Sequence, residues 1–213
     1  MYKILLADAY PICRLGLATL IESVTDLSVC GEADSAHEAQ HLVQKLRPDA
    51  LVLGLQLAQG SGLQLIHSLR AQHQKLPILV VSMYDEILFA ERVIRAGANG
   101  YMHKSETGAN LLVGLRQILK GKLYLSASMS DRLLRSHLHG HVSDPLPSES
   151  KLTDREMEVY MLLGQGYTTK RIANELHLSP KTVDSHKEHI KEKLGITDNI
   201  MLLRRALTWS IEK

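Results

Sequence analysis

The feature that most constrains the fold is a regular alternation of two kinds of segment between Lys3 and Gly121. Five short runs rich in Val, Ile or Leu alternate with longer segments whose apolar residues recur every three or four positions. The short runs span residues 3–8, 27–33, 49–54, 77–82 and 100–104, and the longer segments span 11–24, 35–46, 61–72, 85–97 and 107–121. This alternation predicts an α/β domain, a five-stranded parallel sheet with helices on both faces.

A polar segment follows from residue 125 to 148, with Pro145 and Pro147 near its end. It predicts a short helix and then a linker. His137, His139 and His141 lie within it, but no acidic or sulfur ligand stands beside them. We therefore expect a solvated linker and no metal site.

The region from 149 to 213 has a purely helical pattern. Helices are predicted over 152–166, 168–178, 179–195 and 197–212, which gives a small all-α domain of four helices. Thr153 followed by Glu156 matches a capping box, and Ser179 followed by Pro180 matches a helix start.

The second and third of these helices meet at residues 177–179, the short connection of a helix-turn-helix. Helical spacing directs Val183, His186, Ile190 and Leu194 toward the core or its edge. The outward positions are Lys181, Thr182, Asp184, Ser185, Lys187, Glu188 and Lys191. Taken alone, this pattern fits a helix that reads a DNA major groove and also an ordinary bundle helix with a charged face.

Residues 152–196 resemble the LuxR-type helix-turn-helix along their whole length. The residues that carry the resemblance are Glu156, Gly166, Lys170, Ile172, Ala173, Leu176, Ser179, Thr182, Val183, His186, Lys193 and Leu194. The resemblance implies double-stranded DNA as a partner and a recognition helix from Pro180 to Leu194. It also implies phosphate or groove contacts from Lys170, Thr182, His186, Lys187 and Lys193.

Asp184, Ser185 and Glu188 occupy positions from which some members of that family read bases with basic side chains. Two of the three are acidic here. A carboxylate cannot bind phosphate, but it can accept a hydrogen bond from the N4 amino group of cytosine. We hypothesise that Asp184 or Glu188 contributes to sequence choice.

The charge balance predicts that DNA binding requires a dimer. Residues 149–213 hold eleven Lys and Arg against ten Asp and Glu, and the whole chain has a net charge of +2. Such a domain attracts phosphate weakly as a single copy. The last helix carries an apolar stripe through Ile200, Leu203, Leu207 and Ile211. We expect core packing to use part of this stripe and a homodimer contact to use the rest.

Residues 1–124 resemble the receiver domain of NarL/FixJ-type response regulators, a flavodoxin-like sheet of five strands. In that family an acidic pair, an acceptor aspartate, a hydroxyl residue and a lysine carry out phosphoryl transfer with Mg²⁺. The matching positions here are Asp8 and Ala9 for the acidic pair, Gly54 for the acceptor, Ser82 for the hydroxyl and Lys104 for the lysine. Tyr101 stands at the aromatic switch position, and Ala58 replaces the usual proline.

Gly54 and Ala9 remove the reacting half of this machinery. Glycine supplies no nucleophilic oxygen, and Asp8 alone is a poor anchor for Mg²⁺. Asp49 lies at the other end of the same strand and cannot substitute. We therefore predict a receiver that is not phosphorylated and uses no cofactor, with Lys104 bonded either to Asp8 or to another anion.

These resemblances imply a cytoplasmic transcriptional regulator that binds DNA as a dimer and is not an enzyme. Three inputs stay open: none, with control by expression level; a protein partner at the receiver; or a small ligand at the vacated edge. The alternative function is a protein-interaction antagonist that sequesters other regulators. No stretch is long and apolar enough to span a membrane. Cys13 and Cys30 predict buried thiols.

Overall fold

The computed structural model of the chain describes residues 1–72, 75–106, 108–139 and 147–211. The chain divides into two compact units, Met1–Val142 and Ser143–Lys213. In the parts that the structure describes, no helix is long and apolar enough to cross a membrane.

The first unit is a five-stranded parallel sheet with the strand order β2-β1-β3-β4-β5. The strands are β1 (Tyr2–Ala7), β2 (Leu27–Ala33), β3 (Ala50–Leu53), β4 (Ile78–Ser82) and β5 (Gly100–His103). The helices between and after them are α1 (Pro11–Glu22), α2 (Ala36–Leu46), α3 (Gly62–Gln72), α4 (Glu86–Ala96) and α5 (Gly108–Leu119). This confirms the predicted flavodoxin-like architecture, and each observed element overlaps its predicted range.

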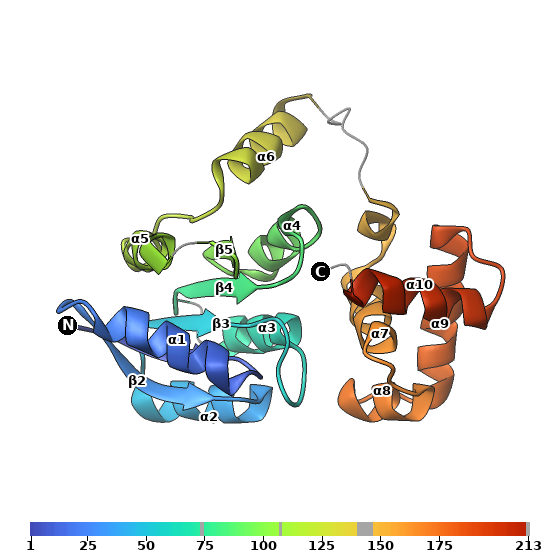
Figure 1. Cartoon of the computed structure of the whole chain (residues 1–213), viewed down its shortest axis with the longest axis horizontal. Coiled ribbons are helices and arrows are strands. Elements are labelled where there is room, and N and C mark those ends of the chain that lie inside the picture. Colours follow the sequence, from blue (N-terminus) through green and yellow to red (C-terminus); the bar gives the residue numbers. More distant parts are fainter. Residues whose placement is uncertain (73–74, 107, 140–146, 212–213) are drawn as a thin grey trace. The chain divides into compact units, whose positions relative to one another are not determined.

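Helices cover both faces of this sheet (Figure 1). Helix α1 packs with α5, whereas α2, α3 and α4 pack side by side as a second set. Every residue of β3 and of β4 is buried, as expected for central strands of a sheet with two covered faces. Because all the strands are parallel, their carboxyl ends meet at one edge of the sheet, where the loops to the next helices begin.

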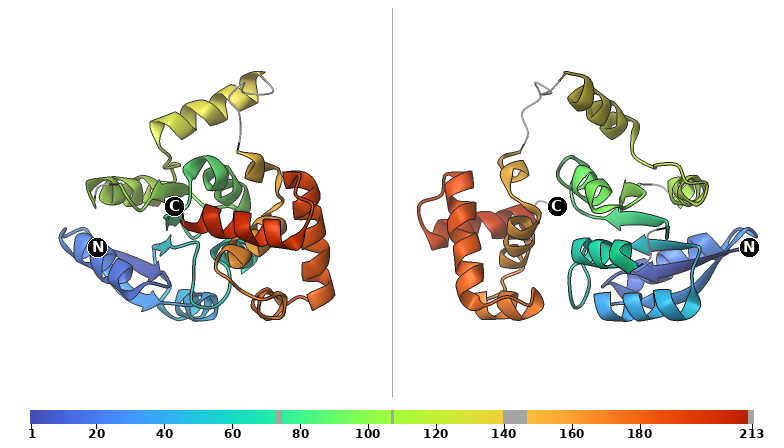
Figure 2. Two further views of the ribbon diagram at one scale, coloured as in Figure 1. Left: turned by 45° about the vertical axis from the view of Figure 1, so that its right-hand side comes forward. Right: turned by 180° about the vertical axis from the view of Figure 1, so that it is seen from behind.

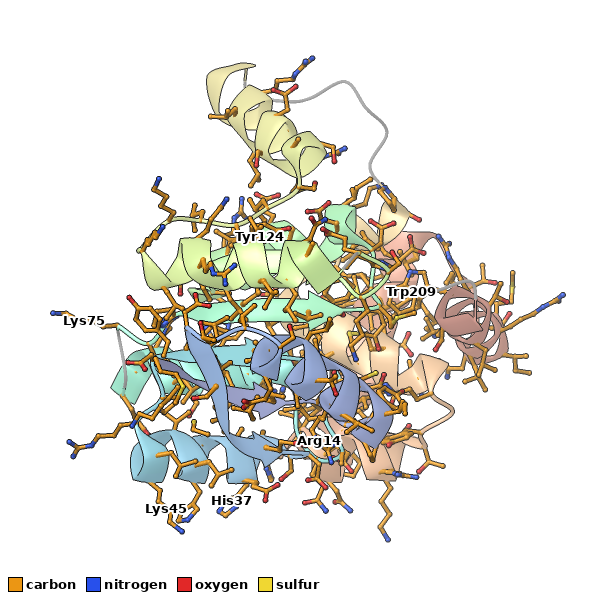
Figure 3. All side chains as sticks on the ribbon, turned by 60° about the vertical axis from the view of Figure 1, so that its left-hand side comes forward. Arg14, His37, Lys45, Lys75, Tyr124 and Trp209 are labelled. Atoms are coloured by element: carbon orange, nitrogen blue, oxygen red, sulfur yellow. The ribbon has the colours of Figure 1, made fainter. Side chains whose placement is uncertain are left out.

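The segment after α5 returns to the sheet. The Tyr101 N–H donates to the Tyr124 carbonyl oxygen at 2.9 Å, and the Tyr124 N–H donates to the Asn99 carbonyl oxygen at 3.0 Å. Tyr124 packs against Gly100 and Gly114, where added Cβ atoms would meet its backbone and its ring. Figure 3 shows Tyr124 beside α5. Residues near Tyr124 thus cover the outer edge of β5.

Helix α6 (Ala127–His139) opens the predicted linker and packs on α4 (Figure 2). Ser126 caps α6 and donates its hydroxyl to Glu86 Oε2 at 2.6 Å, and Met129 is buried. Of the three linker histidines, His141 and the side chains of His137 and His139 lie outside what the structure describes.

The second unit consists of a short 3₁₀ turn, η1 (Ser148–Lys151), and four helices: α7 (Asp154–Gly164), α8 (Thr169–Glu175), α9 (Pro180–Leu194) and α10 (Asn199–Ile211). The predicted capping box is present: Glu156 N–H donates to Thr153 Oγ1, and Thr153 N–H donates to Glu156 Oε2. Ser179 caps α9, and Pro180 is its first residue. The fully buried side chains that hold these helices together are Val159, Tyr160, Ile172, Val183, Ile190, Leu202 and Ala206.

The two cysteines are free thiols, but they are half-buried rather than buried as predicted. Cys13 lies in the first turn of α1. Burial raises the pKa of the Cys30 thiol.

Candidate nucleic-acid interface and the carboxyl edge of the sheet

Four of the five positions predicted for the phosphoryl site lie at the carboxyl ends of β1, β3, β4 and β5. Asp8 follows β1, Gly54 follows β3, Ser82 ends β4 and Lys104 follows β5. Ala9 comes next after Asp8, and its N–H donates to the Gln56 carbonyl oxygen at 3.2 Å. Asp49 lies at the opposite edge, where its Oδ2 accepts from the Lys3 N–H at 2.7 Å.

Asp8 and Lys104 form a buried ion pair at this edge. Lys104 Nζ lies 2.5 Å from Asp8 Oδ2, and the side chains are 13% and 2% exposed. Asp8 Oδ1 accepts from the Tyr10 N–H at 2.9 Å, and Lys104 Nζ lies 5.4 Å from the centroid of the Tyr10 ring. Arg14 on α1, labelled in Figure 3, donates to the Asp8 carbonyl oxygen at 2.7 Å. Of the two alternatives open for Lys104, the structure has the bond to Asp8.

The Asp8 carboxylate occupies the space that a side chain at position 54 would need. An added Cβ on Gly54 would overlap Asp8 Oδ2 and would approach Asp8 Cγ to 3.0 Å. The packing of Asp8 thus favours glycine at position 54. The chemical consequence is that this edge offers no nucleophilic oxygen at the end of β3.

The residues at this edge do not fit Mg²⁺. Octahedral binding of Mg²⁺ uses carboxylate oxygens, and both oxygens of Asp8 already accept hydrogen bonds from Tyr10 and Lys104. Among the residues that the structure describes, no cluster of three or more His, Cys, Asp and Glu is arranged to hold a metal ion.

Tyr101 points into the protein. Its side chain is fully buried, and its hydroxyl donates to the Tyr84 carbonyl oxygen. Ser82 Oγ accepts from the Tyr84 N–H at 3.1 Å. Burial raises the pKa of Tyr101, so its hydroxyl stays protonated. Tyr101 and Ser82 therefore both hold the loop between β4 and α4.

In the second unit, α9 presents a polar face to solvent. Val183, Ile190 and Leu194 are buried, as the spacing predicted. Asp184 and Glu188 have side chains that are each 59% exposed. Lys181 and Ser185 are also exposed, and Thr182 is half-buried beside Ser179, with 2.8 Å between the two hydroxyl oxygens.

Three of the predicted DNA-contacting lysines use their ammonium groups inside the domain. Lys187 Nζ lies 3.4 Å from Asp184 Oδ1, and Lys191 Nζ lies 2.9 Å from Glu188 Oε2; their side chains are 15% and 12% exposed. Lys193 Nζ lies 2.6 Å from Glu156 Oε2. In contrast, Lys170 and Lys181 are exposed, and within the described part of the chain their ammonium groups make no hydrogen bond or ion pair. These two of the predicted lysines therefore leave their ammonium groups in solvent.

His186, which was predicted to contact the DNA groove, lies partly within the packing between the helices. The residue is half-buried, and within the described residues its buried Nδ1 has no hydrogen-bond partner. Burial lowers the pKa of His186, and the nearby Arg155 charge adds to this. The neutral imidazole is therefore the form that packing favours.

Sequence reasoning missed several residues that shape this face. Thr169 on α8 donates its hydroxyl to Asp184 Oδ1 at 3.4 Å and accepts from Lys187 Nζ at 3.3 Å. The Arg171 guanidinium stacks 3.7 Å from the Tyr167 ring centroid. The one available signal was the position of Thr169 in the helix next to the predicted recognition helix; its contact with Asp184 depends on the angle between α8 and α9.

The apolar stripe on α10 is divided differently from the prediction. Leu202 and Ala206 fill the core, whereas Ile200, Leu203 and Leu207 are 81%, 40% and 37% exposed. The side chain of Ile211 lies outside what the structure describes. The three described members of the predicted stripe therefore face solvent in this single chain.

Comparison with known proteins places both units. Residues 4–116 match the model of the response regulator receiver domain, and residues 150–206 match that of bacterial regulatory proteins of the luxR family. The oxygen regulatory protein NreC of Staphylococcus aureus is 32% identical over 212 residues, covering 96% of each chain.

Among solved structures, RcsB of Salmonella enterica serovar Typhimurium, bound to promoter P1flhDC in the presence of phosphomimetic BeF3-, has a TM-score of 0.74. It is 27% identical, and the match covers 96% of this chain and 98% of that one. A structure of two RcsB dimers bound to two parallel DNAs has a TM-score of 0.75 and 28% identity, with the same coverage.

Proposed function

The chain belongs to the response regulators that join a receiver domain to a LuxR-type DNA-binding domain, and from this we propose that it is a sequence-specific transcriptional regulator that works without phosphorylation of its receiver. One observation carries the second half of the proposal. The tip of β3 ends in Gly54, and the Asp8–Lys104 pair closes on itself in the space beside it. The carboxylate and the ammonium thus neutralise each other where a phosphoryl group would need an acceptor and a free cation.

The outward face of α9 supports the DNA-binding half. It offers exposed hydroxyl, carboxylate and ammonium groups on a helix of 15 residues, long enough to lie in a major groove. Lys170, Lys181 and Thr182 lie at its start and on the adjoining α8, and we assign the phosphate contacts to them. The promoter-bound RcsB structures are similar to this chain along nearly their whole length, which supports the same mode of action.

We further propose that the active form is a homodimer held partly by α10. Ile200, Leu203 and Leu207 are large apolar side chains exposed on one helix. Burying them against a second copy removes apolar surface from water. It also doubles the number of phosphate contacts, which a nearly neutral domain needs for tight binding.

We place this activity in the cytoplasm, where chromosomal DNA is, with control by expression level. A protein partner at the receiver is the second input to test, and a ligand at the carboxyl edge the third. A protein that binds other regulators and not DNA is the competing function.

The DNA-binding half is tested by titrating the full-length protein against its own promoter DNA and against random DNA in a gel-shift experiment. We expect tighter binding to the promoter DNA than to random DNA. For Lys181→Ala, we expect the slope of log affinity against log salt concentration to be smaller in magnitude by about one. Equal, weak binding to both DNAs would favour the antagonist.

The phosphorylation-independent half is tested by incubating the protein with acetyl phosphate and Mg²⁺ and measuring its intact mass. We expect no added phosphoryl group and the same DNA affinity before and after. A mass increase that Asp8→Asn abolishes would refute this half and leave the DNA-binding half standing.

Dimerisation is tested by sedimentation of Leu203→Glu, which puts a charge on the exposed stripe. We expect a monomer that keeps its fold and binds a two-half-site DNA more weakly than the unchanged protein. A variant that sediments as the unchanged protein does would assign the contact to another surface.

A further inference from the structure

Asp184 and Glu188 are two of the exposed carboxylates on the outward face of α9, and they are held in different ways. Glu188 Oε2 pairs with Lys191 Nζ at 2.9 Å, a contact within α9 between residues three apart. Asp184 is held from two helices: Lys187 on α9 and Thr169 on α8 both bond to its Oδ1. Asp184 is therefore held toward the body of the domain by contacts from two helices.

Both hydrogen bonds to Asp184 end on the same oxygen. Thr169 Oγ1 and Lys187 Nζ each lie 3.4 Å from Oδ1, and Oδ2 accepts no hydrogen bond from the residues that the structure describes. The side chain is 59% exposed. One oxygen of the carboxylate is thus used for positioning, and the second is left with its acceptor capacity.

Lys187 is almost buried behind this carboxylate, with 15% of its side chain exposed. Its ammonium also donates to Thr169 Oγ1 at 3.3 Å. The positive charge lies on the protein side of Asp184, where it offsets repulsion between the carboxylate and the DNA phosphates. A short side chain with few rotatable bonds, held in this way, loses little entropy when it meets a base.

We infer that Asp184 is a base-reading residue that accepts a hydrogen bond from the N4 amino group of a cytosine in the major groove, and that Thr169 and Lys187 are its positioning residues. In the major groove, cytosine N4 is the donor that a carboxylate acceptor pairs with, whereas guanine and thymine offer acceptors that repel it. Adenine N6 is also a donor, but it lies beside the N7 acceptor. The inference rests on the proposed DNA-binding function and names the base that this face selects.

The test is selection of binding sites from a random double-stranded library by the full-length protein and its variants. Asp184→Asn keeps the shape and removes the charge. We expect it to lose about tenfold of the preference for cytosine at one position of each half-site, with an unchanged salt slope, because Asp184 contacts no phosphate. Glu192→Gln is the matched control: it removes the charge of another exposed acid on α9 and should leave that preference unchanged.

Thr169 is tested with a pair of variants. Thr169→Val removes the hydroxyl without changing the shape, and we expect a several-fold weaker cytosine preference with unchanged stability to urea. Thr169→Ser keeps the hydroxyl and should restore the preference. A purely structural role of Thr169 would instead lower stability and leave the selected sequence as it is.

The outcomes separate this inference from the function on which it rests. An Asp184→Asn variant that selects the same sequence as the unchanged protein overturns the inference and leaves the DNA-binding function intact. A loss of cytosine preference in Glu188→Gln and not in Asp184→Asn also overturns it. An unchanged protein that enriches no sequence overturns both.

Discussion

The carboxyl edge of the receiver and the outward face of α9 both hold acid–base pairs, but they expose them very differently. Asp8 and Lys104 are 2% and 13% exposed, and each is the other's principal partner. On α9, Asp184 and Glu188 are each 59% exposed, and their lysines lie beneath them. The first arrangement turns ionic groups inward, and the second turns acceptors outward.

This difference in exposure indicates that ion pairs affect folding at one place in the chain and ligand binding at the other. A buried ion pair contributes little on balance, but the loss of one partner leaves an uncompensated charge in the interior. An exposed pair contributes little to stability and can give up or share a hydrogen bond when a ligand arrives. Changes at the carboxyl edge should therefore affect folding, and changes on α9 should affect binding.

The largest effect should come from Lys104→Met, which leaves the Asp8 carboxylate buried without its cation. We expect the free energy of unfolding of the receiver to fall by about 3–5 kcal/mol, measured by urea denaturation. Asp8→Leu combined with Lys104→Met removes both charges and should recover much of the loss. Arg95→Gln, which breaks an exposed pair with Glu91, is the control and should cost less than about 0.5 kcal/mol. A cost for Lys104→Met as small as that of the control would contradict the expected difference between buried and exposed ion pairs.

The next effect compares two glycines. Gly54→Ala places a Cβ on the Asp8 carboxylate, which Lys104 and the Tyr10 N–H hold in place, so we expect a cost of about 1–3 kcal/mol. Gly16→Ala adds a Cβ in open space within α1 and should stabilise the receiver by about 0.5–1 kcal/mol, because alanine favours helix. Thermal melts of both variants measure this. Equal shifts of the same sign would show that Asp8 moves aside freely.

Glu156 extends the comparison to a buried carboxylate in the second unit. Burial alone raises the pKa of Glu156, but hydrogen bonds from Lys193 and Thr153 outweigh it and leave that pKa below its ordinary value. The stability that Glu156 contributes is thus present above about pH 4.5 and is lost as the pH falls through the lowered pKa. Lys193→Met should cost about 1–3 kcal/mol near neutral pH, since Thr153 still donates to the carboxylate. Urea denaturation at several pH values checks both expectations; an acid loss that persists unchanged in Glu156→Gln would assign it elsewhere.

The smallest effect should be a mild acid sensitivity from His186. Burial lowers the pKa of His186 in the folded state. As the pH falls below about 6.5, His186 therefore binds a proton in the unfolded chain before it does so in the folded chain. Stability should decline there with a slope no steeper than about 1.4 kcal/mol per pH unit. The measurement is the difference in that slope between the unchanged protein and His186→Gln. An identical slope in both would show that other histidines account for it.

The sequence predicted the fold well where local patterns decide it. Apolar runs and amphipathic spacing indicated all five strands and the helices between them, and the caps at Thr153 and Ser179 marked where helices begin. The short connection at residues 177–179 indicated the turn between α8 and α9, where His177 takes a positive φ of 53°.

What the sequence could not provide was the direction of individual side chains across elements. The choice between Asp8 and another anion for Lys104 depends on a contact between residues 96 apart in the chain. The stripe on α10 looked continuous with the core, yet a turn of the helix places Leu202 and Ala206 inside and Leu203 and Leu207 outside. The position of Thr169 on the neighbouring helix was not enough to predict its bond to Asp184, because that bond arises from the packing of two helices.

Tyr124 gives the segment after α5 a second consequence. An edge strand with free N–H and carbonyl groups invites pairing with strands of other molecules, and proteins often cover such edges. Here Tyr124 exchanges backbone hydrogen bonds with Asn99 and Tyr101, next to the outermost strand, and its ring lies over Gly114. A receiver cut just after Gly121 would lose this cover and would be prone to aggregation. The segment that leads out of the receiver therefore also protects the edge strand β5 from pairing with other molecules.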